Sequence, residues 1–158
     1  MRTYLIILSL TLIGFGSALY LSIHAYQYWN GADATALQNM PCDLSSTFSC
    51  SGILENPRAI IFSIGEFQVA FPMIALVVYP ILFQLALVGY ITRKIIFAKI
   101  ITVMAIGGIA FNGYVISQEI IVWVFCPLCA MCTVIIITIA ILGGLIWREW
   151  SKGWGDQK

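Results

Sequence analysis

The sequence contains very few charged side chains: Asp, Glu, Lys and Arg together make up 9% of its 158 residues. A soluble protein of this size needs more polar surface, and the hydrophobic fraction of 61% lies above the roughly 45–50% of globular proteins. The formal net charge is only +1, and no basic stripe interleaved with aromatic residues indicates a nucleic-acid-binding function. Internal repeats, low-complexity tracts and flexible linkers are also missing. The composition favours a single integral membrane domain over residues 1–158.

Four long apolar runs are present, at about residues 4–28, 69–91, 100–124 and 127–147. Each is long enough for the roughly 20 residues that a helix needs to cross about 30 Å of hydrocarbon. The first run is too long for the core of a signal peptide, so we expect it to remain as a helix. The predicted fold class is an all-α membrane protein: a four-transmembrane-helix bundle with a long extracytoplasmic loop, residues 29–68, between its first two helices.

The positive charges predict the orientation of the four spans. Both termini share a side with the short connection at 92–99, and all but one of the eight Lys and Arg residues lie on that side. The exception is Arg58, in the long loop. Because positive residues accumulate in cytoplasmic segments, we expect a cell-membrane protein with both termini in the cytoplasm and the loops 29–68 and 118–126 outside.

Four of the five cysteines fall at this outer face, which is the oxidising compartment in bacteria, archaea and the secretory pathway. Cys42 and Cys50 lie in the long loop, whereas Cys126 and Cys129 form a Cys-Pro-Leu-Cys motif at the start of the fourth run. Proline suits a first helical position, and the positive end of the helix dipole favours a thiolate there. Thiolates attack disulfides and also leave readily, so these residues predict dithiol–disulfide exchange. Cys129, one turn deeper, could pass electrons to a lipid-soluble acceptor.

Other interpretations of the cysteines remain open. The loop pair could be an inert staple in a four-span membrane scaffold, in which case every outer cysteine would stay in a disulfide that resists mild reductant. Four thiolates could also bind zinc, but the spacing between Cys42 and Cys50 is long for a zinc knuckle. Cys132, the fifth cysteine, lies inside an apolar run, and we expect it to be a small hydrophobic residue without a catalytic role.

The two cysteine motifs, in this order and at this spacing, are specific. The segment Cys-Asp-Leu-Ser-Ser-Thr-Phe-Ser-Cys-Ser at residues 42–51, followed by Cys-Pro-Leu-Cys at residues 126–129, resembles the vitamin K epoxide reductase family. Residues 14–21 resemble it more loosely. The resemblance covers the whole chain and implies a four-helix bundle that holds a quinone of the menaquinone or ubiquinone type, with the outer loop as a lid. The implied activity is that of prokaryotic members, functionally analogous to disulfide-bond formation protein B: a thioredoxin-like partner is reoxidised and its electrons pass to the quinone.

The resemblance also implies a role for each outer cysteine. Cys42 would react with the thiols of the partner, and its disulfide with Cys50 would start the cycle. Cys50 would attack the disulfide between Cys126 and Cys129, and Cys129 would face the quinone. No thioredoxin-like domain follows Lys158, so we expect the partner to be a separate protein.

Two departures from the family pattern bear on the substrate. Thr133 stands where mammalian members have a tyrosine, four residues after the second cysteine of the Cys-x-x-Cys motif. The start of the second run, residues 65–72, offers no asparagine as a hydrogen-bond donor to a quinone. Both departures favour quinone reduction over the alternative, reduction of a vitamin K-type epoxide.

A quinone pocket needs apolar walls and one or two polar groups near the outer ends of the spans. The candidate polar contacts are His24, Gln68, Asn112 and Gln118, and the candidate walls are Phe67, Phe71, Trp123 and Phe125. Each has an ordinary alternative, because polar and aromatic residues also gather at the membrane interface. We further expect Ala59–Phe67 to lie on the membrane surface as a short amphipathic helix that helps the loop cover the quinone.

Overall fold

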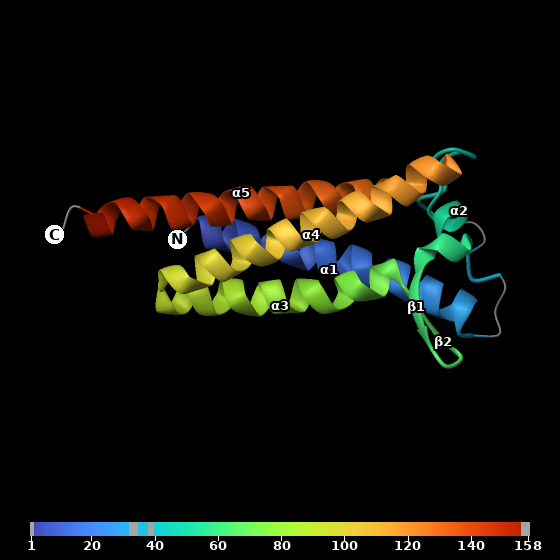
Figure 1. The fold of residues 1–158 in the computed structure, drawn as a ribbon, viewed down its shortest axis with the longest axis horizontal. Helices are drawn as coiled ribbons and strands as arrows, with labels where there is room; N and C mark the ends of the chain where they lie inside the picture. Colours follow the sequence, from blue (N-terminus) through green and yellow to red (C-terminus); the bar gives the residue numbers. More distant parts are fainter. Residues whose placement is uncertain (1, 32–34, 38–39, 156–158) are drawn as a thin grey trace.

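The computed structural model describes residues 2–31, 35–37 and 40–155, with side chains as far as residue 149. The four long helices lie side by side, and the smaller elements gather at one end, opposite the beginning of α1 and the end of α5 (Figure 1). Helix α1 packs mainly against α3, and α4 against α5. The elements in chain order are α1 (Arg2–Trp29), α2 (Cys50–Leu54), the 3₁₀ turn η1 (Pro57–Ala59), β1 (Ile60–Ile64), β2 (Phe67–Ala70), α3 (Phe71–Thr92), α4 (Ile95–Val122) and α5 (Pro127–Gly155).

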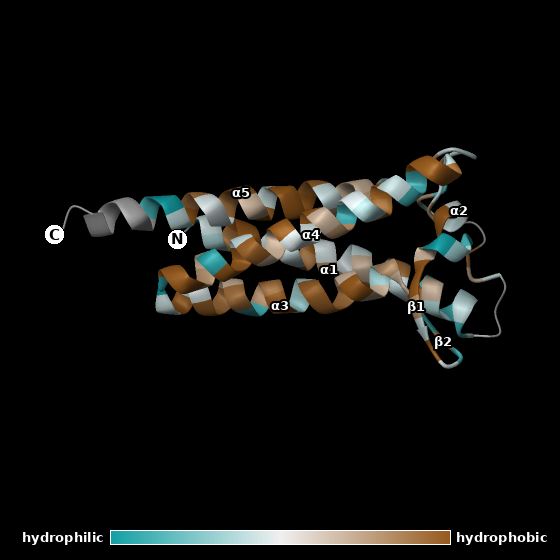
Figure 2. Cartoon of the chain, in the orientation of Figure 1, coloured by the Kyte–Doolittle hydropathy of each residue, from teal (hydrophilic) through white to brown (hydrophobic). Residues whose placement is uncertain are grey.

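The predicted four-helix membrane bundle is confirmed. Helices α1, α3, α4 and α5 are each long and apolar enough to cross a membrane. Apolar residues cover most of their length (Figure 2), and large side chains such as Leu12, Val103 and Val134 remain exposed on the outside of the bundle. A helix satisfies its backbone hydrogen bonds internally, so lipid can cover such a surface without cost. The chain is therefore a multi-pass membrane protein.

The helix that contains the third apolar run, α4, begins at Ile95, about five residues before that run. Helix α3 ends where Arg93 takes a left-handed backbone conformation (φ 52°) and donates its N–H to the Gly89 carbonyl. After Lys94, apolar residues start the next helix, so Lys99 lies inside α4. Its ammonium group lies 5.5 Å from the ring centre of Trp147, and this cation–π contact accommodates the charge near the helix end.

The expected amphipathic helix at Ala59–Phe67 is wrong, because this segment forms most of an antiparallel hairpin of β1 and β2. Ile64 pairs with Phe67, which leaves Gly65 and Glu66 as a two-residue turn. Gly65 has a positive φ of 62°, a conformation that glycine adopts without steric cost. The β-branched isoleucines of β1 favour a strand, and together with this turn they outweigh the amphipathic pattern.

The bundle contains a close contact between α1 and α3 at Gly14. A Cβ atom at this position would overlap the ring of Tyr79, which is only 4% exposed. The Tyr79 hydroxyl donates a hydrogen bond to the Cys132 carbonyl on α5 at 3.4 Å. Gly14 therefore leaves the space that allows the Tyr79 ring to lie between the helices.

A buried cluster of apolar side chains holds the long loop against the end of the bundle. Apolar side chains of the loop pack there against residues of α1, α3 and α4 and against two of the outer cysteines. Its loop members include Leu37, Met40, Cys50, Ile53 and Leu54, and its members at the start of α5 are Cys126 and Cys129. Burial of this apolar surface holds the loop over this end of the bundle.

Candidate active site

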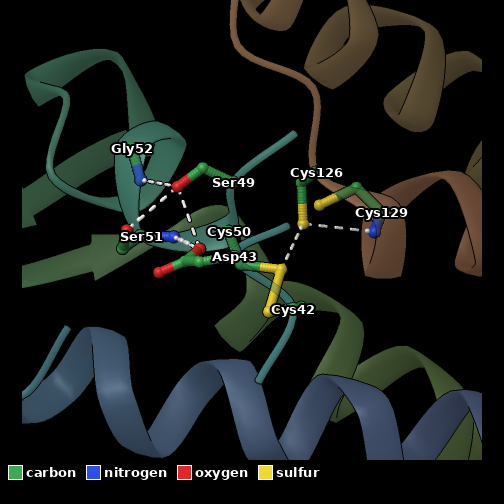
Figure 3. Close-up of a disulfide and its surroundings, with 8 residues drawn as sticks. All are labelled: Cys42, Asp43, Ser49, Cys50, Ser51, Gly52, Cys126 and Cys129. Atoms are coloured by element: carbon green, nitrogen blue, oxygen red, sulfur yellow. Dashed lines mark hydrogen bonds between the residues drawn. A yellow bond between two sulfur atoms is a disulfide. The ribbon is translucent and has the colours of Figure 1, made fainter. Parts of the chain in front are cut away.

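Cys42 and Cys50 form a disulfide at the end of the bundle that carries the long loop, with their Cα atoms 5.8 Å apart (Figure 3). Cys50 is the first residue of α2, and Ser49 caps this helix by accepting the Gly52 N–H at 3.0 Å. Cys50 is fully buried, whereas Cys42 is partly exposed. A thiol that arrives from solution therefore reaches Cys42 more readily. In this state the two disulfide-bonded sulfurs cannot serve as thiolate ligands of a zinc site.

The carboxylate of Asp43 organises the loop around the disulfide. Its Oδ1 accepts hydrogen bonds from the Ser49 hydroxyl at 2.9 Å and from the Ser51 N–H at 3.0 Å (Figure 3). Partial burial raises the pKa of Asp43, but hydrogen bonds from Ser51, Ser49 and the Cys50 backbone outweigh it, so the pKa lies below its ordinary value. Asp43 is thus ionised at neutral pH and holds the residues on both sides of Cys50.

Phe125 connects the outer loop to the start of α5. Its N–H donates to the Thr47 carbonyl at 2.7 Å, and its carbonyl accepts the Ser49 N–H at 3.0 Å, which together form a parallel β-bridge with Phe48. These bonds lie one and three residues before Cys50 on the loop and one residue before Cys126 on the other segment. They bring the two cysteines together although they lie 76 residues apart in the sequence.

Cys126 faces the loop disulfide. Its Sγ lies 3.3 Å from the Cys50 Sγ and accepts the backbone N–H of Cys129 at 3.4 Å (Figure 3). Cys126 and Cys129 are free thiols, 1% and 6% exposed. As predicted, Cys126 immediately precedes α5 and Pro127 is its first residue. The first turn of a helix has unpaired N–H groups, and the one that reaches Cys126 would stabilise a thiolate there.

A cavity of about 300 Å³ lies between the four long helices, and Cys129 is part of its wall. Most of the lining is aliphatic or aromatic, from residues of all four helices. The few polar groups at the wall belong to Tyr79, Asn112, Cys129 and Cys132. Mostly apolar cavities of this size with a few polar groups are typical sites for small flat ligands.

Two of the eight candidate ligand contacts lie at this cavity. Phe71 and Asn112 are part of its lining, whereas Gln68, Gln118 and Trp123 are not. Gln118 lies six residues beyond Asn112 along α4, about 9 Å farther toward the outer loop, where its side chain accepts a hydrogen bond from a loop arginine. Gln68 lies in β2, and Trp123 is 77% exposed at the end of α4.

The remaining candidates also lie outside the cavity lining. His24 Nδ1 is 2.8 Å from the Ala36 carbonyl, so this ring holds the outer loop. Phe67 lies in β2 and is 43% exposed, while Phe125 takes part in the bridge to Phe48. These residues lie in the loop region or attach the loop to the bundle, and none of them lines the cavity.

Sequence reasoning missed two residues of the site. Tyr79 lies in the middle of an apolar run, where nothing distinguishes it from an ordinary core aromatic. Glu119 is 3% exposed, and its carboxyl oxygen and the sulfurs of Cys126 and Cys129 all lie within 4.8 Å of one another. A signal for Glu119 was present, because it is the only acidic residue inside any of the four apolar runs.

The sequence profile of the vitamin K epoxide reductase family matches residues 5–143. The chain belongs to this family. Members of the family are membrane thiol–disulfide oxidoreductases that use quinone-type substrates, and this family member carries two cysteine pairs in contact with each other. No individual curated protein matches the chain.

Proposed function

We propose that this protein oxidises the dithiol of a separate thioredoxin-like protein outside the cytoplasm and passes the two electrons to a membrane quinone. The electrons would travel first through Cys42 and Cys50 and then through Cys126 and Cys129. The observation that carries this proposal is the 3.3 Å contact between the sulfurs of Cys50 and Cys126. This contact joins a disulfide near solvent to Cys126, and Cys129, the second thiol of that pair, lies in the wall of an apolar cavity.

The first exchange takes place at the loop. A thiolate of the partner attacks Cys42, the more exposed sulfur of the disulfide, and Cys50 leaves as a thiolate. The second thiol of the partner then attacks the mixed disulfide. The partner departs with a disulfide, and Cys42 and Cys50 remain as a dithiol.

The second exchange takes place at the contact between the pairs. The Cys50 thiolate attacks Cys126 in the Cys126–Cys129 disulfide, and Cys129 leaves as a thiolate beside the cavity. Attack of Cys42 on Cys50 then restores the loop disulfide and frees Cys126. This is the state of the structure, with one disulfide in the loop and free thiols at Cys126 and Cys129. Cys126 and Cys129 rejoin as two electrons and two protons reach the quinone.

The cavity offers hydrogen-bonding groups suited to a quinone, of menaquinone or ubiquinone type. Asn112 donates one amide N–H to the Gly108 carbonyl at 3.1 Å, which leaves its other polar groups for a ligand. The Tyr79 hydroxyl donates a long hydrogen bond of 3.4 Å to the Cys132 carbonyl, so it can turn toward a quinone oxygen. Phe71 supplies an aromatic wall.

The orientation of the chain in the membrane is part of the proposal. With both termini in the cytoplasm, the end of the bundle that carries α2 and the hairpin faces outward (Figure 1). The excess of Lys and Arg on the terminal side supports this orientation. All four reacting cysteines would then meet the oxidising compartment, where the thioredoxin-like partner works.

The test is quinone reduction by the purified full-length protein, supplied with a reduced thioredoxin-like protein and with soluble menaquinone or ubiquinone analogues. We expect Cys129→Ala to abolish quinol formation, because the pair that delivers the electrons is lost. Thr138→Ala, a partly exposed position on the same helix, is the matched control and should keep the wild-type rate. Absence of turnover with several quinones and partners, while the outer cysteines resist mild reductant, would favour the membrane scaffold instead.

A further inference from the structure

We propose that Glu119 is the proton donor and acceptor of the Cys126–Cys129 pair, a role that rests on the proposed function. Its carboxyl oxygen lies within 4.8 Å of both sulfurs of the pair. The residue is 3% exposed, and its Oε1 has no hydrogen-bond partner. An unpaired carboxylate oxygen is costly to bury, so its retention beside two reacting sulfurs indicates a chemical use.

The end of α4 holds Glu119 in this position. The helix ends at Val122, and Trp123 takes a left-handed conformation (φ 56°) that turns the chain toward α5. The N–H groups of Trp123 and Val124 both bond to the Glu119 backbone carbonyl, so the residue is held by two capping bonds. The turn returns the chain so that Cys126, seven residues later, lies beside the Glu119 side chain.

The charges at this position explain why a proton must move. A carboxylate and a thiolate within 4.8 Å of each other would place two negative charges in a buried site. Two like charges at such a distance in a poorly solvated site destabilise each other strongly, so one proton stays on either the carboxyl oxygen or the sulfur. Glu119 and a cysteine sulfur therefore share one proton, which moves to the oxygen when the sulfur reacts as a thiolate.

The exchange step can be written with this proton included. The Cys50 thiolate and the Cys126–Cys129 disulfide, with Glu119 as the neutral acid, give the Cys50–Cys126 disulfide, the Cys129 thiol and the Glu119 carboxylate. One S–S bond forms and one breaks, and the single negative charge passes from Cys50 to Glu119. When Cys126 and Cys129 later rejoin and two electrons pass to the quinone, the Cys129 thiol proton returns to the Glu119 oxygen, and the quinone takes up one proton from Cys126 and one from water. Glu119 is thus neutral when the pair is oxidised and ionised when the pair is a dithiol.

The substitution that tests this role is Glu119→Gln, which keeps the size of the side chain but cannot carry the proton. Positioned acid–base groups contribute roughly 100-fold or more to the rate, so we expect quinone reduction to fall by about 100-fold. Glu119→Asp should recover part of this loss. Glu66→Gln is the matched control, because it makes the same change at an exposed position in the hairpin turn.

The second readout is infrared difference spectroscopy of the full-length protein between its oxidised and reduced states. We expect the C=O band of a protonated carboxyl group when the pair is a disulfide, its loss on reduction, and its absence in Glu119→Gln. A wild-type rate in Glu119→Gln would overturn the proposal. The proposal would also be overturned if Glu119→Gln is slower but the carboxyl band of the wild-type protein does not change with the redox state. That combination indicates a structural role. The band requires no quinone, so it remains a test of Glu119 even if quinone turnover fails in the wild type.

Discussion

The contact between Cys50 and Cys126 should depend on the side chain of Asp43. This carboxylate accepts two hydrogen bonds from residues beside Cys50, at 2.9 Å and 3.0 Å. Hydrogen bonds to charged groups contribute about 1.5–3 kcal/mol each, and partial exposure to water reduces this contribution. We therefore expect Asp43→Ala to destabilise the loop conformation by about 2 kcal/mol. A free-energy change of this size corresponds to about 30-fold in an equilibrium constant.

The assay measures how readily Cys50 and Cys126 form a disulfide with each other. In a chain with Cys42, Cys129 and Cys132 replaced by alanine, the two remaining thiols are equilibrated with oxidised and reduced glutathione. Their effective concentration follows from the fraction of protein that contains the disulfide. Adding Asp43→Ala should lower this effective concentration by about 30-fold.

The control for this experiment is Glu66→Ala, which removes an exposed acidic side chain of the hairpin turn and should change nothing. If the Asp43→Ala chain has an effective concentration within twofold of that of the parent chain, the reasoning is refuted. The β-bridge of Phe48 and Phe125 would then be sufficient to hold the two sulfurs together without the carboxylate.

Three further predictions concern the loop, the cavity and the membrane orientation. The pKa of Asp43 is lowered in the folded loop, so the ionised side chain stabilises the loop fully at pH values above its ordinary pKa of 3.8. This stabilisation is lost as the pH falls through the lower pKa of the folded state. Hydrogen exchange at the Ser51 amide, corrected for its intrinsic pH dependence, should accordingly lose protection at low pH; unchanged protection would contradict this. Gly14→Leu should displace Tyr79, lower the stability by about 1–3 kcal/mol in thermal unfolding and weaken quinone binding. Gly16→Leu, which meets open space, should do neither, and equal effects of the two would be the contrary result. Glu66→Cys should react with an impermeant maleimide on intact cells, whereas Lys94→Cys should react only after lysis. The reverse pattern would show that the chain has the opposite orientation.

Part of the architecture could be predicted from the sequence because it depends on local properties. The length and apolarity of four segments determine that each crosses the membrane as a helix. The position of Pro127 directly after Cys126 places that cysteine at the start of the last helix. The failed expectation at Ala59–Phe67 shows the limit of this reasoning, because a short apolar segment can match both a helix and a strand. The turn at Gly65 decides between them.

Only part of the site could be predicted from local patterns in the sequence. The sequence identified the four cysteines, and the family resemblance, rather than any local pattern, implied that Cys50 would attack the disulfide of the helix pair. The contact between the two pairs is set by the hydrogen bonds of Phe125 to Thr47 and Ser49, which join segments far apart in the chain. Among the candidate ligand contacts, Phe71 and Asn112 reach the cavity while Gln68 does not. Gln68 and Phe71 lie only three residues apart at the start of the second run, so their position along the chain could not separate them.

The sequence by itself determined that this is a four-helix membrane protein with two cysteine pairs near one face, since hydropathy and residue order are properties of the chain alone. Only the tertiary structure decided that Tyr79 reaches the cavity and that the Glu119 carboxyl lies beside Cys126 and Cys129. Both placements depend on how the helices pack: Gly14 on α1 makes room for the ring, and the turn at Trp123 returns the chain toward Glu119. Proximity between distant side chains is a property of packing, which no local pattern of residues specifies.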